Sequence, residues 1–248
     1  DFIFIPELQK RLPNHPFLQK VESESEGFSD EKIKLPEKML STDKAYTWGE
    51  IEKWLERISK FSEEINVQLS EIQIKGTAKL DGFAGYDDGK KLYTRGDGNK
   101  GSDISRVFQR GLGILNDSER GQGPGEIVVK RSYFEDHLSN DFEYPRNFQA
   151  SLIKEKELDK FARDAIDAKA ALFVPFKQLP FWKGNIDEFK NQFLDIVIKL
   201  EEGVDFDIDG VVFEIVNPEL KEFMGSNRKF HRWQIAYKEN KEKAQVKV

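Results

Sequence analysis

The order of strand-like and helix-like patterns along the chain constrains the fold more strongly than any other feature of the sequence. Short apolar runs separated by the turn "YDDGKK" predict a β-hairpin between Ile72 and Thr94, and "DIDGVVFEIV" and "HRWQIAYK" read as strands. Helical patterns lie between these runs, but without the regular alternation of a βαβ protein, and no internal repeat is visible. The sequence therefore predicts an α+β fold.

Several segments carry helix signals. Thr47 and Glu50 have the spacing of a capping box at the start of "TWGEIEKWLERISKF", whose apolar residues recur on one helical face. The segment 186–200 has the same periodicity and is followed by a stop signal, Gly203, and a further helical pattern spans roughly 157–170. Two weaker signals lie between these segments. A helix that runs to about Gly111 can be capped by Ser102 and Asp103, and "GEIVVKRSYF" alternates like a strand.

Composition narrows the class of protein. The 248 residues suffice for one large domain or two modest ones, and 38% hydrophobic residues with twenty Phe predict a soluble protein with a Phe-rich core. A net charge of −6 has the wrong sign for a generally basic surface, so any nucleic-acid contact must come from a local patch. The lack of Cys fits a cytosolic protein, and the scattered His15, His137 and His231 argue against a His metal site. Neither a membrane span nor a signal peptide is indicated.

The window "AKLDGFAGYDDGKKLYTRGDGNKGSDISR" contains two signals that point to different enzymes. "GDGNKG" satisfies the GxGxxG spacing of dinucleotide-binding folds, but the preceding "KKLYTR" is polar and belongs to a hairpin, whereas a parallel central strand should be almost continuously apolar. The GxxxxGK[ST] spacing of a P-loop is not met either. We interpret the glycines as a turn that needs positive φ, with Asp97 and Asn99 bonding to the backbone.

The second signal is Lys79, which stands two residues before Asp81-Gly82. A KxDG tetrapeptide alone is weak, since a strand lysine that points to water beside an Asp-Gly turn has the same sequence. Its neighbours along the chain make it specific. They are "LPEKMLSTDKAY", "AKLDG", "TRGDGNKGSDIS", "GEIVV", "YPRN", "IDGVV" and "HRWQIAYK", in that order.

Together these motifs resemble the adenylation (nucleotidyltransferase) domain of NAD-dependent DNA ligases, over roughly residues 13–238. The resemblance implies the fold shared by DNA ligases and mRNA capping enzymes, with mostly antiparallel sheets flanked by helices. It also implies a Mg²⁺-dependent enzyme that takes AMP from NAD, passes it to the 5′-phosphate of nicked DNA and seals the nick, in DNA replication and repair. The compact hairpin between Lys79 and Arg95 is most similar to viral or phage-like members.

By this resemblance Lys79 is the nucleophile that attacks the α-phosphate of NAD, expels nicotinamide mononucleotide and becomes lysyl-AMP. A neutral amine near neutral pH requires the pKa of a lysine to fall by about three, which corresponds to roughly 4 kcal/mol. Arg95 and Lys238 match the family's arginine and terminal lysine, and are the catalytic cations expected near Lys79. The same charges should stabilise the phosphate in the transition state.

The resemblance also assigns the remaining site residues. Asp209 and Glu126 match acidic residues expected to hold Mg²⁺, with a ribose contact as a second possibility for Glu126. Arg146, in "YPRN", matches an arginine expected to meet a DNA phosphate. We expect Asp81 and Gly82 to shape the turn that presents Lys79. The residues predicted to contact the cofactor NAD are Ser41, Thr42, Thr77, Lys79, Leu80, Arg95, Glu126, Glu214 and Lys238.

Three departures from the family pattern leave alternatives open. Thr77 replaces a glutamate that hydrogen-bonds adenine, "YPRNFQASLI" shortens the usual DNA-contacting run, and Glu214 replaces the lysine of "DGVVxK". The last change reverses a charge beside an anionic substrate, unless another base such as Lys130 or Lys154 substitutes, or Glu214 turns away or binds metal. A degenerate nucleotide-binding module without turnover is therefore one alternative to a ligase, because of Glu214. An ATP-dependent RNA ligase or capping-type enzyme is another, because such enzymes share KxDG and the terminal lysine.

The resemblance predicts three parts of the chain. Residues 1–35 should be a remnant of the N-terminal NMN-recognising subdomain and its linker, residues 36–240 the adenylation domain, and residues 241–248 the start of a linker to a missing OB domain. Zinc, helix-hairpin-helix and BRCT parts are expected beyond it. We expect a cytoplasmic monomer with no membrane contact, whose partner in the full-length protein is nicked double-stranded DNA.

Overall fold

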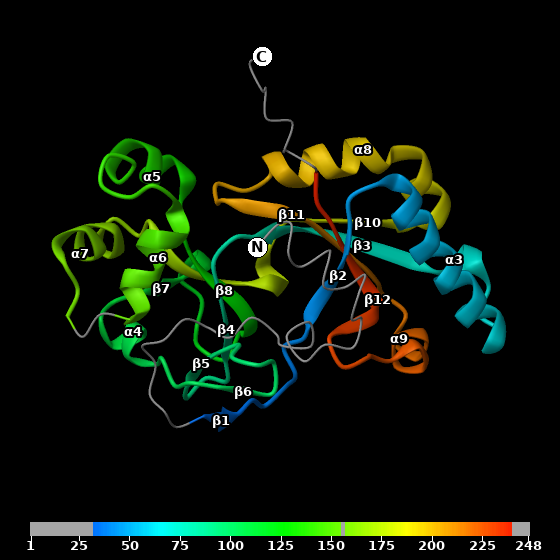
Figure 1. The fold of residues 1–248 in the computed structure, drawn as a ribbon, viewed down its shortest axis with the longest axis horizontal. Helices are drawn as coiled ribbons and strands as arrows, with labels where there is room; N and C mark the ends of the chain where they lie inside the picture. The colour runs from blue at the N-terminus through cyan, green and yellow to red at the C-terminus, as the bar shows by residue number, and fades with distance from the viewer. Residues whose placement is uncertain (1–31, 155–156, 240–248) are drawn as a thin grey trace, which may run out of the picture.

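The computed structural model describes residues 32–154 and 157–239 and has an α+β architecture, which confirms the predicted fold class (Figure 1). Two five-stranded sheets lie side by side, and β1 (Ile33–Lys34) and β6 (Lys100–Gly101) form a small third one. The helices are α3 (Trp48–Glu64), α4 (Arg106–Gln109), α5 (Arg131–His137), α6 (Pro145–Lys154), α7 (Lys160–Asp167), α8 (Ile186–Glu202) and α9 (Pro218–Met224). The 3₁₀ turns are η1 (Leu69–Glu71), η2 (Leu115–Asp117) and η3 (Phe176–Gln178).

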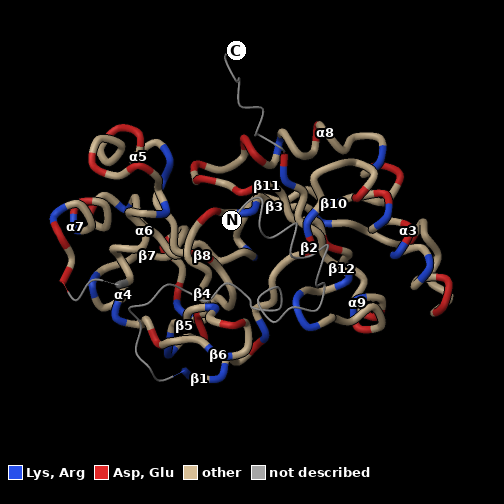
Figure 2. The backbone as a smooth tube through the Cα atoms, viewed as in Figure 1, with Lys and Arg blue, Asp and Glu red and all other residues tan. Residues whose placement is uncertain are grey.

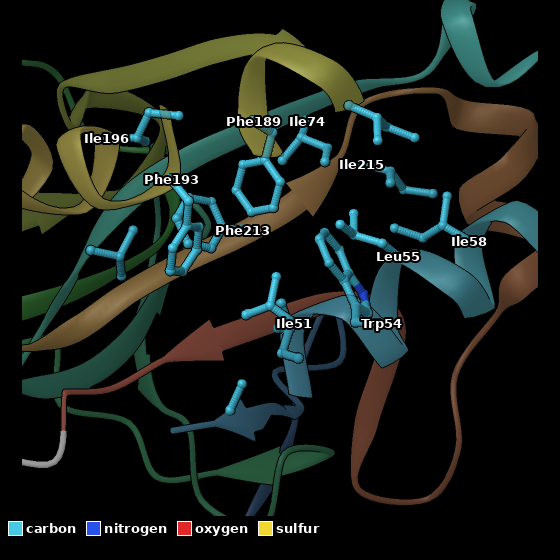
Figure 3. Close-up of a cluster of buried hydrophobic side chains, with 14 of the residues drawn as sticks. Ile51, Trp54, Leu55, Ile58, Ile74, Phe189, Phe193, Ile196, Phe213 and Ile215 are labelled. Atoms are coloured by element: carbon cyan, nitrogen blue, oxygen red, sulfur yellow. The ribbon is translucent and has the colours of Figure 1, made fainter. Parts of the chain in front are cut away.

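The first sheet has the order β10-β3-β11-β12-β2, and its pairs are antiparallel except β12 with β2. Helices α3, α8 and α9 cover one face of it. The core between them is rich in aromatic rings, as the number of Phe predicts, and Phe189 lies at its centre against Phe193 and Phe213 (Figure 3). Within residues 32–154 and 157–239, no helix covers the opposite face of this sheet. Its strands are β10 (Phe181–Asn185), β3 (Gln73–Leu80), β11 (Ile208–Ile215), β12 (Phe230–Tyr237) and β2 (Ser41–Ala45).

The second sheet has the order β5-β4-β8-β9-β7, and its pairs are antiparallel except β7 with β9. Helices α4, α6 and α7 pack on it around a second core that contains Phe148 and Phe173. A third, smaller cluster joins the two sheets and contains Leu80, Val128 and Val174. The strands are β5 (Leu92–Thr94), β4 (Phe83–Asp87), β8 (Gly123–Val129), β9 (Ala171–Pro175) and β7 (Gly113–Ile114).

The longer helices form where periodicity and capping predict them. Helix α3 begins after Thr47, whose side chain accepts the backbone N–H of Glu50 while Glu50 bonds back, so the capping box is confirmed. Helix α8 buries the predicted apolar face and ends at Gly203. The pattern at 157–170 forms the shorter helix α7, because Asp159 caps it by accepting the N–H of Ala162.

Two local predictions are wrong. The N-cap residue of α4 is Ser105, and neither Ser102 nor Asp103 caps the helix: Asp103 accepts the backbone N–H of Ser105, and Ser102 is buried. Helix α4 is only one turn long. The strand in "GEIVVKRSYF" ends at Val129, because the chain turns at Lys130 into helix α5. Short helices of this length carry too little periodicity to be read from sequence.

The predicted hairpin exists, but its strands are β4 and β5, and the prediction that Lys79 lies on its first strand is wrong. Lys79 is near the end of β3, in the first sheet, and the chain crosses to the second sheet at Asp81-Gly82. Gly82 makes this crossing possible, since a Cβ there would stand 2.4 Å from the carbonyl oxygen of Ile127. The nucleophile candidate therefore sits where the two sheets meet.

The glycine run after β5 is a turn, as predicted. Gly96 and Gly98 have φ of 54° and 88°, values that favour glycine. The carboxylate of Asp97 accepts the backbone N–H groups of Asn99 and Lys100, both at 2.8 Å. The loop packs against the segment before β2, because the N–H of Met39 donates to Gly98.

Candidate active site between the two sheets

The centre of the candidate site is Asp209, which pairs with both lysines predicted to be catalytic. Its Oδ2 lies 2.9 Å from the Nζ of Lys79 and 2.5 Å from the Nζ of Lys238. The three residues come from the ends of β3, β11 and β12, adjacent strands of the first sheet. Residues 130 positions apart in the chain therefore meet in one cluster.

The local backbone explains how Asp209 reaches both lysines. Gly210 has φ of 112° and interrupts the pairing of β11 with β3, so the strand bulges at this point. Burial alone would raise the pKa of Asp209, but the hydrogen bond from Lys238 and the charge of Lys79 outweigh it and hold the pKa below its ordinary value. The carboxylate is therefore ionised at neutral pH.

Glu126 occupies the other side of the crossing, on β8 of the second sheet. Its Oε2 accepts the backbone N–H of Gly82 at 2.7 Å. Desolvation raises the pKa of Glu126 to about 7, against the opposing charge of Lys79 and the Gly82 hydrogen bond. This group can therefore change its protonation state near neutral pH, which ordinary carboxylates do not.

Arg146 lies at the start of α6 and contacts the crossing as well. Its guanidinium donates to Asp81 at 3.0 Å and stands 5.9 Å from the ring centroid of Phe83. The Arg146 side chain is 61% exposed, so it is accessible at the rim of the site. Both Asp81 and Arg146 were predicted from the sequence as site residues, but the ion pair between them was not predicted.

Arg95, the third predicted catalytic cation, has a different partner. Its guanidinium donates to the hydroxyl of Ser41 at 3.0 Å, which links the end of β5 to the start of β2. Ser41 and Thr42 lie half-buried on β2, at the other end of the first sheet from β10. The structure thus brings together Arg95 and Ser41, and separately Lys79, Asp209 and Lys238.

Glu214, at the position of the family lysine, forms an ion pair that the sequence reading missed. Its carboxylate lies 3.1 Å from the Nζ of Lys221 on helix α9, and that ammonium stands 4.3 Å from the ring of Trp233. The negative charge of Glu214 is therefore balanced by Lys221. Lys130 is at the N-cap position of α5, where its side chain makes no capping hydrogen bond, and the side chain of Lys154 lies outside the described part of the chain. The only sequence signal for Lys221 is its place seven residues after Glu214.

Two further cofactor-contact candidates face opposite ways on β3. Thr77 shares the face of Lys79 and lies directly across from Val212. Leu80 is 2% exposed in the cluster that joins the sheets, so only its main chain can reach a ligand on the Lys79 face.

The described residues show surface hollows away from this cluster. One of about 550 Å³ is lined by residues such as Phe108 and Arg120, and one of about 430 Å³ by residues such as Trp48 and Tyr237. Within residues 32–154 and 157–239 no group of three or more acidic or histidine side chains is arranged to hold a metal ion. In the same part of the chain no helix is long and apolar enough to cross a membrane.

Two mostly antiparallel sheets, with a lysine–carboxylate–lysine cluster where they meet, define the chain as a nucleotidyltransferase-type domain. A model of the NAD-dependent DNA ligase adenylation domain matches residues 28–172. The chain therefore belongs to the NAD-dependent DNA ligase adenylation domain family.

The chain is also similar to curated DNA ligases of bacteria. It is 60% identical to the DNA ligases of Ruthia magnifica and Vesicomyosocius okutanii, over all of this chain and 40% and 39% of those proteins. It is 52% identical to the DNA ligase of Psychromonas ingrahamii, over 99% of this chain and 38% of that protein. The expected similarity to viral or phage-like members of the family finds no support, because these relatives are bacterial. The chain spans about two fifths of the length of the relatives it matches.

Proposed function

We propose that this chain forms lysyl-AMP on Lys79 from NAD, and that in the complete protein the AMP passes to the 5′-phosphate of nicked DNA before the nick is sealed. The observation that carries the proposal is the pairing of Lys79 and Lys238 with one oxygen of Asp209, in a chain of this family. We further propose that the protein acts as a monomer in the cytoplasm.

The first step is an exchange of bonds at the α-phosphorus of NAD. The Lys79 amine donates its electron pair to phosphorus and forms a P–N bond, while the bond to the nicotinamide mononucleotide oxygen breaks and that oxygen leaves with its electron pair. The amine must be neutral to do this, so the Lys79 ammonium gives up one proton to solvent and parts from Asp209, 2.9 Å away, and the nitrogen loses a second proton to solvent once the P–N bond has formed. A substrate phosphate beside Lys238 would compete for the cation that Asp209 now holds.

We propose Asp209 and Glu126 as the carboxylates that hold Mg²⁺. They flank the nucleophile from two sheets, and Mg²⁺ is commonly bound by one or two carboxylates together with substrate phosphates, so a pair suffices where a larger acidic cluster is absent from the described residues. When bound, the metal would supply a positive charge against the phosphate. Because Glu126 has a pKa of about 7, the metal would bind best above that pH, where the carboxylate is ionised.

Arg146 is proposed as a DNA phosphate contact, and Arg95 and Ser41 as a contact to the nucleotide. Arg146 is exposed at the rim of the site and can exchange Asp81 for a phosphate oxygen. Both acidic and basic residues occur along the outer helices α3, α7 and α8 (Figure 2), so a broad basic surface does not explain DNA binding there.

The test is to incubate the intact protein with NAD and Mg²⁺ and to measure a covalent AMP adduct by mass spectrometry. Lys79→Ala should abolish the adduct, since it removes the nucleophile, and Lys79→Arg should do the same while keeping the charge beside Asp209. Lys90→Ala, an exposed lysine in the β4–β5 turn, is the matched control and should leave the adduct unchanged. An adduct that persists in both Lys79 variants would overturn the proposal. An adduct formed from ATP but not from NAD would show that ATP, and not NAD, is the AMP donor.

A further inference from the structure

Phe181 is an exposed aromatic residue on the face of the first sheet that carries Lys79. It lies on the edge strand β10, where it is 59% exposed. The register pairs it directly with Thr77, so the two side chains point to the same face, two residues along β3 from Lys79. The next residue, Trp182, alternates to the opposite face and packs on Phe189. Phe181 is therefore the aromatic ring that this strand leaves outside the core.

One row of residues across this face is small and uncharged. Thr77 pairs with Val212 on β11, and Val212 pairs with Ala236 on β12. Phe181 stands at the β10 end of this row. Ala236 is fully buried, so the accessible part of the row is Thr77 and Val212, which can form an uncharged floor with an aromatic side chain at its edge.

Charged residues border the floor on both sides. Lys79, Asp209 and Lys238 lie at one side, and Lys75 with its cross-strand neighbour Glu214 at the other. A ligand whose phosphate is held by the lysines must place its uncharged ring where it displaces no charge, because desolvating a charge is costly. The floor beside Phe181 meets this condition.

The Phe181 ring is also held in place. The Nζ of Lys75 stands 5.2 Å from the ring centroid, close enough for a cation–π contact. This contact limits the freedom of an otherwise exposed side chain, so less entropy is lost when a ligand packs on it.

We propose that Phe181 is a binding residue for the purine ring of the AMP donor, which packs on the floor formed by Thr77 and Val212 and against the Phe181 ring. The inference rests on the proposed function, since it takes the AMP phosphate to lie at Lys79. It adds an aromatic contact to the base, on a strand that none of the motifs includes. In this proposal Phe181 contributes to binding of the purine ring and does not contact the reacting atoms.

The experiment measures AMP binding by calorimetry, and the KM and kcat for NAD in adenylation, with the intact protein. Phe181→Ala should weaken AMP binding about tenfold, because a stacking contact with a base is typically worth that much or more, and should raise KM similarly with kcat unchanged. Phe181→Tyr should bind AMP like the wild type. Ribose 5-phosphate, which has no base, should bind both proteins equally.

Leu194→Ala is the matched control, since Leu194 is a 62% exposed apolar residue on the outer side of α8. It should change neither affinity. Unchanged AMP binding by Phe181→Ala, or an equal loss of ribose 5-phosphate binding, would overturn the inference, as would a wild type that binds no AMP. A wild type that binds AMP but forms no adduct with NAD would contradict the proposed function and leave the role of Phe181 to be decided by the AMP data.

Discussion

At the scale of single residues, the site is organised by two carboxylates with opposite properties. Asp209 is stabilised as a carboxylate by two lysines, whereas Glu126 is partly desolvated and has a pKa of about 7. Two carboxyl groups whose environments push their pKa values apart are a common feature of sites that carry out acid–base or metal chemistry. Their difference can be measured directly.

Glu126→Gln should stabilise the protein at alkaline pH. The pKa of Glu126 is raised from 4.5 to about 7 in the folded protein, so below pH 4.5 its burial costs nothing, and ionisation costs stability increasingly as the pH rises through 7. The full cost is on the order of 3 kcal/mol. Gln stays neutral and can still accept the Gly82 N–H, so urea unfolding should show equal stability near the lower pKa and a more stable variant above the higher one.

The control for this experiment is Glu56→Gln, since Glu56 is exposed on α3. Its effect on the free energy of unfolding should not vary over the same range of pH. A Glu126→Gln effect that is equally flat would show that the carboxyl is not desolvated.

The sequence predicts the identity of the site residues better than their contacts. Lys79, Asp209 and Lys238 stand in motifs, so they could be named. The sequence could not identify Lys221 as the partner of Glu214. Lys221 lies on α9, which follows β11 after a short loop, and the position of this helix depends on tertiary packing.

At the scale of elements, the bulge in β11 brings the cluster together. Gly210→Ala should destabilise the protein by at least about 2 kcal/mol, because its φ is positive and a Cβ would stand 2.1 Å from the carbonyl oxygen of Tyr237. Since Asp209 and Lys238 flank the clash, adenylation should be lost even where the variant is folded. Thermal unfolding and the adduct assay measure the two effects.

Gly49→Ala is the matched control, because Gly49 lies in helix α3 with no atom within 4 Å of an added Cβ. It should stabilise the protein by no more than about 1 kcal/mol and keep full activity. A Gly210→Ala protein that is as stable and as active as this control would contradict the role given to the bulge.

Element prediction succeeded where the local signal is strong. The capping box of α3, the apolar stripes of α3 and α8, and the Asp-Gly turn between β4 and β5 all form as expected. The separation of β3 from β4 was missed, because Asp81-Gly82 interrupts the pattern only briefly and the change of sheet depends on pairing with β11 and β8.

At the scale of the whole molecule, the cluster between the two sheets sets the position of Lys79 relative to Glu126. Leu80→Ala and Leu200→Ala each remove a buried leucine, 2% and 4% exposed, and each should cost about 2–5 kcal/mol of stability. Leu80 belongs to the joining cluster and Leu200 to the core under the first sheet. Only Leu80→Ala should also slow adenylation about tenfold or more at a temperature where both variants are folded, because small misplacements of reacting groups are costly. Equal rates in the two variants would contradict this.

The arrangement of the sheets is the part of the fold that the sequence did not predict. The α+β class follows from the irregular order of patterns, but the pairing of β3 with β11 joins residues more than a hundred positions apart. Periodicity carries no information about such long-range partners. The family resemblance supplied the expectation of mostly antiparallel sheets, and the structure confirms it.

Lys79 should carry the AMP, and Lys238, its neighbour on the same carboxylate, should not. After reaction of the intact protein with NAD and Mg²⁺, peptide mapping by mass spectrometry should locate the adduct on Lys79 alone. Lys238 lies 2.5 Å from the same oxygen of Asp209 and is the closest competing amine by this geometry. AMP found on Lys238, or on any lysine other than Lys79, would contradict the account.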